Sequence, residues 1–119
     1  MRTQHVFAAK LLFQFHVVAR NGNSDRRRLT EERIVVFHAR EPRSALTAAK
    51  SLGRAGETNY PNDHGDDVRF EFVGILDLQQ LGVENDQHEV WYELRYRMTP
   101  MERRQELIPS DAILVRRAT

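Results

Sequence analysis

The sequence predicts an α+β fold: a four-stranded antiparallel sheet in ββαββ order, one helix packed on one face, and a short C-terminal helical or extended appendix. Two observations lead to this prediction. Four stretches alternate apolar and other residues with a period of two, which is typical of strands that bury one face. One stretch between the second and third strands carries apolar residues at helical spacing. The 119 residues predict a single domain over residues 1–98 and an extension over residues 99–119 that packs on the same domain.

Composition and charge argue against several functional classes. The formal net charge of +1 favours neither a nucleic-acid-binding stripe nor an acidic tail. The chain has no cysteine, which excludes disulfides, thiolate chemistry and cysteine zinc sites. The N-terminal stretch MRTQHVFAAKLLFQFHVVA is too polar and too short to span a bilayer, and it shows no clear cleavage pattern. We therefore expect a cytoplasmic protein that binds no nucleic acid, no membrane and no cofactor.

Residues 7–19 and 29–39 are expected to form the first hairpin. Every odd residue of the first stretch is apolar and its even residues are mixed, so one face is buried and the other is half covered. The sequence NGNSD at residues 21–25 supplies the turn. Placing Ala19 opposite Leu29 sets the odd apolar residues of both strands on the core face. This register predicts two pairs on the other face: His16 with Glu32, and Lys10 with His38.

A helix is expected to begin at Pro42, a residue well suited to a first helical position, and to end at Gly53. Its apolar stripe is rich in alanine, which predicts a close approach to the sheet. Near the C-terminus, TPME at residues 99–102 has the spacing of a capping box and predicts a short helix to about Leu107. Residues 111–117 are expected to form a short edge strand or a loose tail.

The last two strands of the predicted sheet are VRFEFVGILDL at residues 68–78 and VWYELRYRM at residues 90–98. Both alternate with a period of two, so each is expected to bury one face. Paired as a hairpin, they place Glu71 opposite Arg97. The even residues of the first strand face the core in this arrangement, and Gly74 leaves room for the alanine-rich helix.

Several segments of the chain carry a resemblance to a known family. They are AAKLLFQF, EERIVVFHA, the helical SALTAA, YPN, VRFEFVGILDL and EVWY. Together they resemble a bacterial family catalogued only as domain of unknown function four-two-eight-eight, over about residues 6–97. The resemblance implies a small α+β domain and no established activity.

The sheet face that points away from the helix, which we call the outer face, is the most informative feature for function. An apolar centre with a charged rim and an aromatic anchor is typical of an interface or binding site. Three alternatives are open: residues 99–119 cover this face, it self-associates, or it binds a foreign ligand or partner. The expected apolar floor is Leu12, Ile34, Val36, Val73 and Ile75, beside Trp91. The expected rim is Lys10, Gln14, His16, Glu32, Arg69, Glu71, Asp77, Glu93, Arg95 and Arg97.

Other groups of polar residues have an ordinary structural explanation. The five histidines show no metal-ligand spacing, and in the predicted hairpin His16 and His38 lie ~20 Å apart. NDHGDD at residues 62–67 lies in a turn-rich connector and lacks the spacing of a calcium loop. The arginines at residues 26–28 have no interleaved aromatic residues, unlike a single-strand-binding surface. Because no nucleophile motif or phosphate-binding loop is found, we predict no catalytic and no metal-binding residue.

The leading hypothesis is a non-enzymatic protein-interaction module that acts as a homodimer or binds a protein partner through the outer face. Its predicted binding residues are Trp91, Arg95, Glu93, Glu71, Arg97, His16 and Glu32. A second hypothesis is a toxin-neutralising or regulatory partner protein, since the chain is small and this face has mixed charge. A third is a small-molecule-binding or hydrolytic domain with a cleft between the outer face and the C-terminal segment. Its polar groups are His16, Glu32, Glu93 and Arg95.

Overall fold

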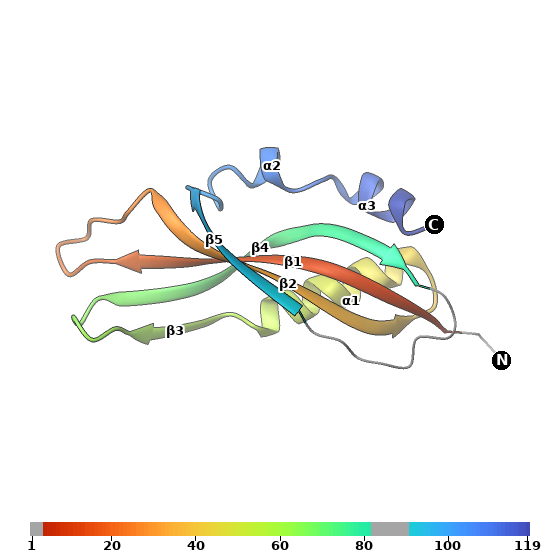
Figure 1. Ribbon diagram of the computed structural model, residues 1–119, viewed down its shortest axis with the longest axis horizontal. Helices are drawn as coiled ribbons and strands as arrows, with labels where there is room; N and C mark the ends of the chain where they lie inside the picture. The colour runs from red at the N-terminus through yellow and green to blue at the C-terminus, as the bar shows by residue number, and fades with distance from the viewer. Residues whose placement is uncertain (1–3, 82–90) are drawn as a thin grey trace.

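The computed structural model describes residues 4–81 and 91–119, the second range with side chains from Arg95 onward (Figure 1). The elements in chain order are β1 (His5–Val18), β2 (Arg27–Ala39), α1 (Pro42–Ala55), β3 (Thr58–Pro61), β4 (Asp67–Gln80), β5 (Trp91–Met98), α2 (Arg104–Leu107) and α3 (Asp111–Arg117). The strands form an antiparallel sheet in the order β3-β4-β1-β2-β5. The predicted α+β class with an antiparallel sheet is therefore confirmed. In the described part of the chain the sheet has five strands instead of four. The prediction of an edge strand or a loose tail at residues 111–117 is wrong, because these residues form α3, whose first turn is capped by the Ser110 side chain.

The additional strand is β3, which lies in the stretch predicted to be a turn-rich connector. Its four residues pair with the first residues of β4, and all four are exposed. Pro61 is tolerated there because β3 is an edge strand. A short strand that buries neither face has no alternation in its sequence, which explains why the pattern did not reveal it.

The β1–β2 hairpin forms as predicted, but its register is shifted by four residues. Phe13 lies opposite Glu31 rather than Val35. The chain reverses direction earlier in the sequence than predicted, because the backbone N–H of Gly22 donates to the carbonyl of Ala19 at 2.8 Å. Gly22 has a φ of 81°, which glycine adopts without strain. Because the shift is an even number of residues, each residue keeps its predicted face.

The predicted hairpin between the last two long strands is wrong. β5 pairs with β2, whereas β4 pairs with β1 on the other side of the sheet (Figure 1). Glu71 therefore lies opposite Gln14, and Arg97 lies opposite Arg28. This order makes β1 the central strand, which agrees with its apolar residues on both faces.

The middle of β4 contains two register shifts against β1 that change which residues face the core. Ile75, predicted on the outer face, lies opposite Leu11 and is 1% exposed in the core. Gly74 lies opposite Leu12, and a Cβ atom at Gly74 would come within 2.8 Å of the Ile108 side chain. The prediction that Gly74 makes room for α1 is therefore wrong. It makes room for the C-terminal segment.

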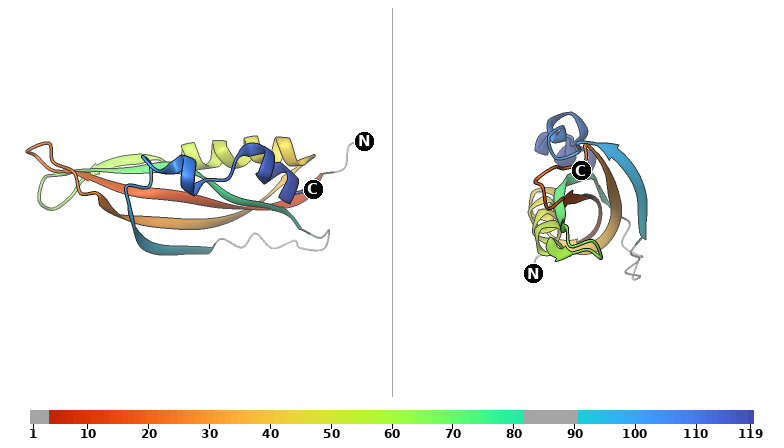
Figure 2. Two further views of the ribbon diagram at one scale, coloured as in Figure 1. Left: turned by 90° about the horizontal axis from the view of Figure 1, so that it is seen from above. Right: turned by 90° about the vertical axis from the view of Figure 1, so that its left-hand side faces the viewer.

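Helix α1 begins at Pro42 as predicted but continues past Gly53 to Ala55, and it packs on one face of the sheet, which we call the helix face (Figure 2). Ala45 and Ala49 are fully buried, as the alanine-rich stripe predicts. The close approach occurs at Gly53, where an added Cβ atom would overlap the ring of Phe72. The core around α1 consists of Phe7, Ala9, Leu11, Phe13, Ala39, Ala45, Leu46, Ala49, Phe70, Ile75, Leu78, Leu114 and Ala118.

The segment after β5 crosses the outer face and then reaches α1. At its start, the backbone N–H of Thr99 donates to the carbonyl of Arg26 at 2.6 Å. Near its end, Leu114 of α3 is 1% exposed in the core, and Asp111 accepts from Lys50 Nζ of α1 at 2.9 Å. In the end-on view of Figure 2, α1 lies to the left of the sheet and α2 and α3 lie at the top. The C-terminal segment thus covers the edge of β4 that β3 leaves unpaired.

Candidate functional site

The residues predicted to bind a partner lie on the outer face, but on two separate parts of it. The register of β1 and β4 brings His16 and Glu71 together at the hairpin end. Glu32, Arg95 and Arg97 lie together where β2 meets β5. The backbone of β5 sets Glu93 opposite Glu32 and Trp91 opposite Ile34, and the side chains of both lie outside the described residues. The predicted cross-strand pairs His16–Glu32 and Lys10–His38 are wrong.

Glu32 is the centre of one polar cluster. Its side chain is 7% exposed, and its Oε2 atom lies 3.1 Å from Arg95 Nε and 3.1 Å from Arg97 Nη2. Its Oε1 atom lies 3.7 Å from Lys10 Nζ. A carboxylate this deeply buried needs cationic partners, because its desolvation is otherwise costly. The cluster therefore joins β5 to β2 and β1. In this position Glu32 holds neighbouring strands of the sheet together.

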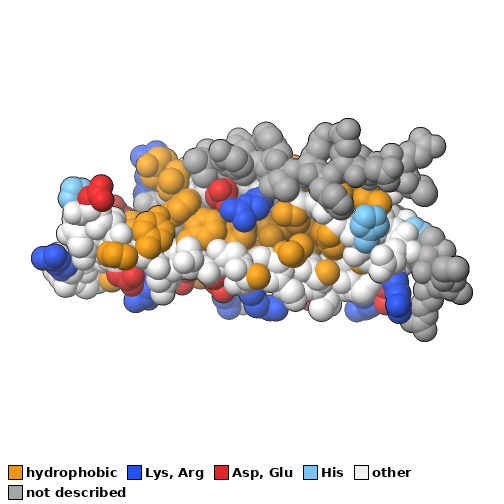
Figure 3. Space-filling model, turned by 90° about the horizontal axis from the view of Figure 1, so that it is seen from below, with side chains coloured by type: hydrophobic (Ala, Val, Ile, Leu, Met, Phe, Trp, Pro, Cys, Tyr) orange, Lys and Arg blue, Asp and Glu red, His pale blue; other side chains and the backbone are white. Residues whose placement is uncertain are grey.

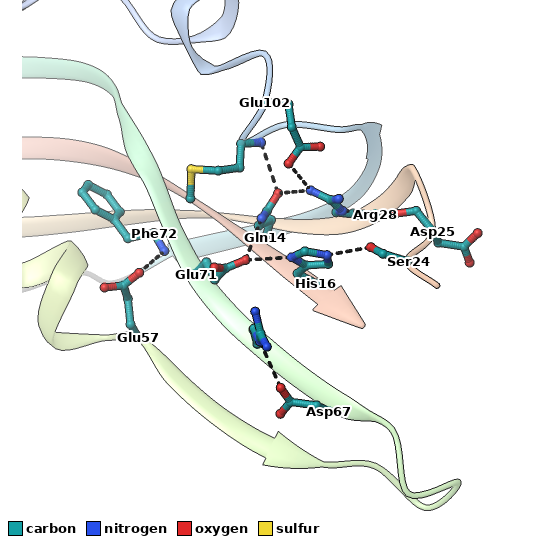
Figure 4. A network of polar contacts seen from close by, with 12 residues as sticks. Gln14, His16, Ser24, Asp25, Arg28, Glu57, Asp67, Glu71, Phe72 and Glu102 are labelled. Atoms are coloured by element: carbon teal, nitrogen blue, oxygen red, sulfur yellow. Dashed lines mark hydrogen bonds and ion pairs between the residues drawn. The ribbon is translucent and has the colours of Figure 1, made fainter. Parts of the chain in front are cut away.

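Gln14 is the centre of a second polar cluster at the hairpin end (Figure 4). Its side chain is fully buried. Gln14 Nε2 donates to Glu71 Oε1 at 2.9 Å. Gln14 Oε1 accepts from Arg28 Nη1 and from the backbone N–H of Met101, both at 3.2 Å. Arg28 Nη1 also donates to Glu102 Oε1 at 2.7 Å, so the C-terminal segment is fastened to this cluster.

His16 extends the second cluster to the surface. Its Nδ1 atom lies 3.1 Å from Glu71 Oε1, and its Nε2 atom lies 2.6 Å from Ser24 Oγ (Figure 4). Ser24 belongs to the exposed turn between β1 and β2. Sequence reasoning assigned NGNSD to a turn and therefore missed Ser24. The contacts of His16 with Ser24 and Glu71 follow only from the hairpin register and the β1–β4 pairing taken together.

The expected apolar floor of the outer face is not open over β1 and β4. Leu12 is fully buried and Val73 is 7% exposed. Ile75 has turned to the core, and Ile108 packs against Gly74. The cavity of about 370 Å³ beside this segment is lined by residues of α1, β4 and the C-terminal helices, and not by His16, Glu32 or Arg95. This cavity is therefore not the cleft of the third hypothesis, which stays a prediction.

A group of exposed apolar side chains lies instead on the helix face, beyond the end of α1. Val17, Tyr60, Tyr96 and Met98 are 37–59% exposed there, and we call this the hairpin-end surface. The first three of these residues line a cavity of about 320 Å³. The Arg27 guanidinium lies over the Tyr96 ring, 4.9 Å from its centroid. Figure 3 shows hydrophobic side chains that continue along this face.

The sequence did not predict the hairpin-end surface for two reasons. Val17 belongs to the odd set of β1, which the pattern assigned to the core, but α1 ends before it can cover that position. Tyr60 lies in β3, which the sequence analysis placed in a connector. The lengths of the predicted elements could have indicated this surface. A helix of 14 residues spans about 21 Å, and a strand of the same number of residues is much longer, so the helix cannot cover the whole strand.

The described residues contain no metal-binding cluster and no helix that could span a membrane. Among the side chains that the structure describes, in residues 4–81 and 95–119, no three His, Asp or Glu groups lie together so that they could hold a metal ion. In the acidic stretch at residues 62–67, Asn62 Oδ1 accepts from the backbone N–H groups of His64 and Asp66, so this segment forms a turn. None of the helices in the described part of the chain is both long enough and apolar enough to cross a membrane.

Comparison with known proteins supports the resemblance seen in the sequence. The model of the family described as Domain of unknown function (DUF4288) matches residues 6–92. No curated protein and no solved structure matches the chain. The matched range runs from β1 into β5 and includes α1, so it covers most of the sheet. The chain belongs to the DUF4288 family of domains of unknown function.

Proposed function

We propose that this protein is a protein-interaction module that forms a homodimer through its hairpin-end surface. The observation that carries the proposal is the grouping of large exposed apolar side chains at one end of the helix face. Tyr96 is 59% exposed, Met98 47%, Tyr60 43% and Val17 37%. A contiguous apolar patch with aromatic residues is characteristic of an interface, whereas single exposed apolar residues are ordinary.

The chemistry of this surface supports binding to a protein. Its cavity has mainly apolar walls and two tyrosines, and polar groups from Asp25, Arg27 and Asn62 stand at its border. An apolar centre with a polar rim is the usual anatomy of a protein–protein interface. Tyr96 and Arg27 belong to the residue types enriched at energetic hot spots. Because Arg27 stacks on Tyr96, the tyrosine ring is held in place before a partner arrives.

A second copy of the chain is the partner that the fold favours. The hairpin-end surface continues onto β5, and in the described part of the chain no strand pairs with the outer edge of β5. An uncovered strand edge readily pairs with another strand. Pairing two copies about a two-fold axis would cover both edges and bring both apolar surfaces into one interface.

Analytical ultracentrifugation of the full chain tests this proposal. We expect the wild type to sediment with twice the mass of the chain. Tyr96→Asp should sediment as a monomer at the same concentration, because the substitution places a charge in the apolar interface. Ile113→Asp is the matched control: Ile113 is 40% exposed on α3, which lies at the opposite end of the molecule from the β1–β2 turn (Figure 1), so this variant should remain dimeric.

The outcomes separate the alternatives. A monomeric wild type, or a Tyr96→Asp variant that stays dimeric, contradicts the proposal. If Trp91→Asp alone dissociates the dimer, the interface lies on the outer face, where the sequence analysis placed the binding residues. Circular dichroism of each variant shows that the change in mass is not a consequence of unfolding.

A further inference from the structure

Three side chains at the hairpin end form a continuous chain of hydrogen bonds that ends at a hydroxyl group. Ser24 Oγ lies 2.6 Å from His16 Nε2, and His16 Nδ1 lies 3.1 Å from Glu71 Oε1 (Figure 4). The residues come from three parts of the chain: the β1–β2 turn, the end of β1, and β4. A nucleophile bound to a base, with the base oriented by a third group, is the arrangement of serine hydrolases.

The protonation pattern of this chain follows from its partners. An ionised carboxylate can only accept a hydrogen bond, so the proton of a neutral His16 ring lies on Nδ1, directed at Glu71. Nε2 then carries the lone pair and accepts from the Ser24 hydroxyl. The imidazole therefore has the tautomer that a general base needs to take a proton from serine.

The orienting carboxylate is itself held by buried groups. Glu71 Oε1 accepts from Gln14 Nε2 at 2.9 Å, and Gln14 is fully buried. Gln14 is fixed in turn by Arg28 and by the backbone of Met101. The supporting contacts thus extend from the surface serine through the sheet to the C-terminal segment. Such a supporting shell is what holds a catalytic group in one geometry.

We propose that Ser24 is a catalytic nucleophile for the hydrolysis of small carboxylic esters, with His16 as general base and Glu71 as the positioning residue. This activity lies on the outer face and is independent of the proposed dimer. Ser24 Oγ attacks the ester carbonyl carbon while its proton passes to His16 Nε2. The bond to the alkoxy group then breaks, and the alcohol leaves with that proton. Water hydrolyses the acyl-serine, His16 again transfers the proton, and Ser24 is regenerated.

Ser24 is exposed to solvent, so a substrate can reach its hydroxyl group. The cavity of about 430 Å³ next to Glu71 is lined by residues 57–59 and by residues of β4, and by neither Ser24 nor His16. Arg69 lines that cavity and lies directly opposite His16 in the β1–β4 register. Its guanidinium is ion-paired with Asp67, with Arg69 Nε 3.0 Å from Asp67 Oδ2. A substrate oxygen that used Arg69 to stabilise negative charge would share this cation with Asp67.

Hydrolysis of p-nitrophenyl acetate by the full chain tests the proposal. We expect a rate above that of buffer, reduced at least ~100-fold by Ser24→Ala and by His16→Gln. Ser51→Ala is the matched control, because Ser51 is an exposed serine on α1 away from this cluster. A fluorophosphonate probe should add its mass to the peptide that contains Ser24, and this adduct should be missing in Ser24→Ala.

The same distances would serve a hydrogen bond that only closes the hairpin, so the readout must be chemical. Equal rates for wild type, Ser24→Ala and buffer overturn the proposal, as does a probe adduct on any other residue. A loss of rate in Ser24→Ala without a loss in His16→Gln removes His16 as the base. Ser24 is exposed, so Ser24→Ala should keep its melting temperature within a few degrees of the wild type.

Discussion

Replacing Leu114 by alanine tests whether the C-terminal segment is part of the core. Leu114 is 1% exposed and lies in the same cluster as the core residues of α1 and β4. The substitution removes the equivalent of three methylene groups, worth about 2.4 kcal/mol by transfer alone. The cavity left behind adds to this, because a helix held by α1 and β4 can relax only in part. We expect the free energy of unfolding to fall by about 3 kcal/mol.

Urea denaturation followed by far-ultraviolet circular dichroism measures this change. The midpoint should fall while the slope of the transition is unchanged, and the melting temperature should fall by about 12 °C. Ile113→Ala is the matched control, since Ile113 precedes Leu114 in α3 but is 40% exposed. Its cost should stay below about 1 kcal/mol. Equal small costs for both variants would refute the reasoning, because α3 would then not contribute to the core.

Two further substitutions test the packing on each face of the sheet. Gly53→Ala should lower the free energy of unfolding by about 1 kcal/mol or more, although alanine favours helices, because the new methyl group overlaps the Phe72 ring. Thermal melts of the double variant with Phe72→Leu should recover part of this loss, and a stabilised Gly53→Ala protein would contradict the model. Gln14→Leu should cost about 2 kcal/mol in urea denaturation, because Glu71 and the backbone of Met101 each lose a partner in a buried site. A neutral result would show that these groups are hydrated.

The sequence was sufficient to predict the local structure and the face of most side chains. Period-two alternation identified β1, β2, β4 and β5, and Pro42 correctly marked the start of α1. Gly53 was expected to end the helix but lies inside it, since α1 continues to Ala55. Strand order could not be predicted, because β5 carries the same alternation whether it pairs with β4 or with β2. The bulges in β4 could not be predicted either, since the period of two assigns Ile75 to the outer face and the register shifts place it in the core.

The candidate sites were less predictable than the fold. His16 and Glu71 were named as binding residues, but their contact depends on the β1–β4 pairing that the sequence analysis did not predict. Ser24 gave no signal, because serine is ordinary in a turn. Tyr96 was assigned to the buried side of its strand, and it is exposed because α1 does not extend that far. Each of these errors concerns where distant elements meet.

The observed register of the hairpin follows from buried polar groups rather than from hydrophobic pattern. A shift of β2 by an even number of residues leaves every apolar side chain on its face, so burial of apolar area cannot distinguish these registers. The predicted register would set Gln14 opposite Ile34, whereas in the structure it lies opposite Thr30 and next to Arg28. Leaving a buried polar group unpaired costs ~1–3 kcal/mol, and Gln14 and Glu32 would both lose partners supplied by the present alignment. The two polar clusters of the outer face therefore select the register that the apolar residues leave open.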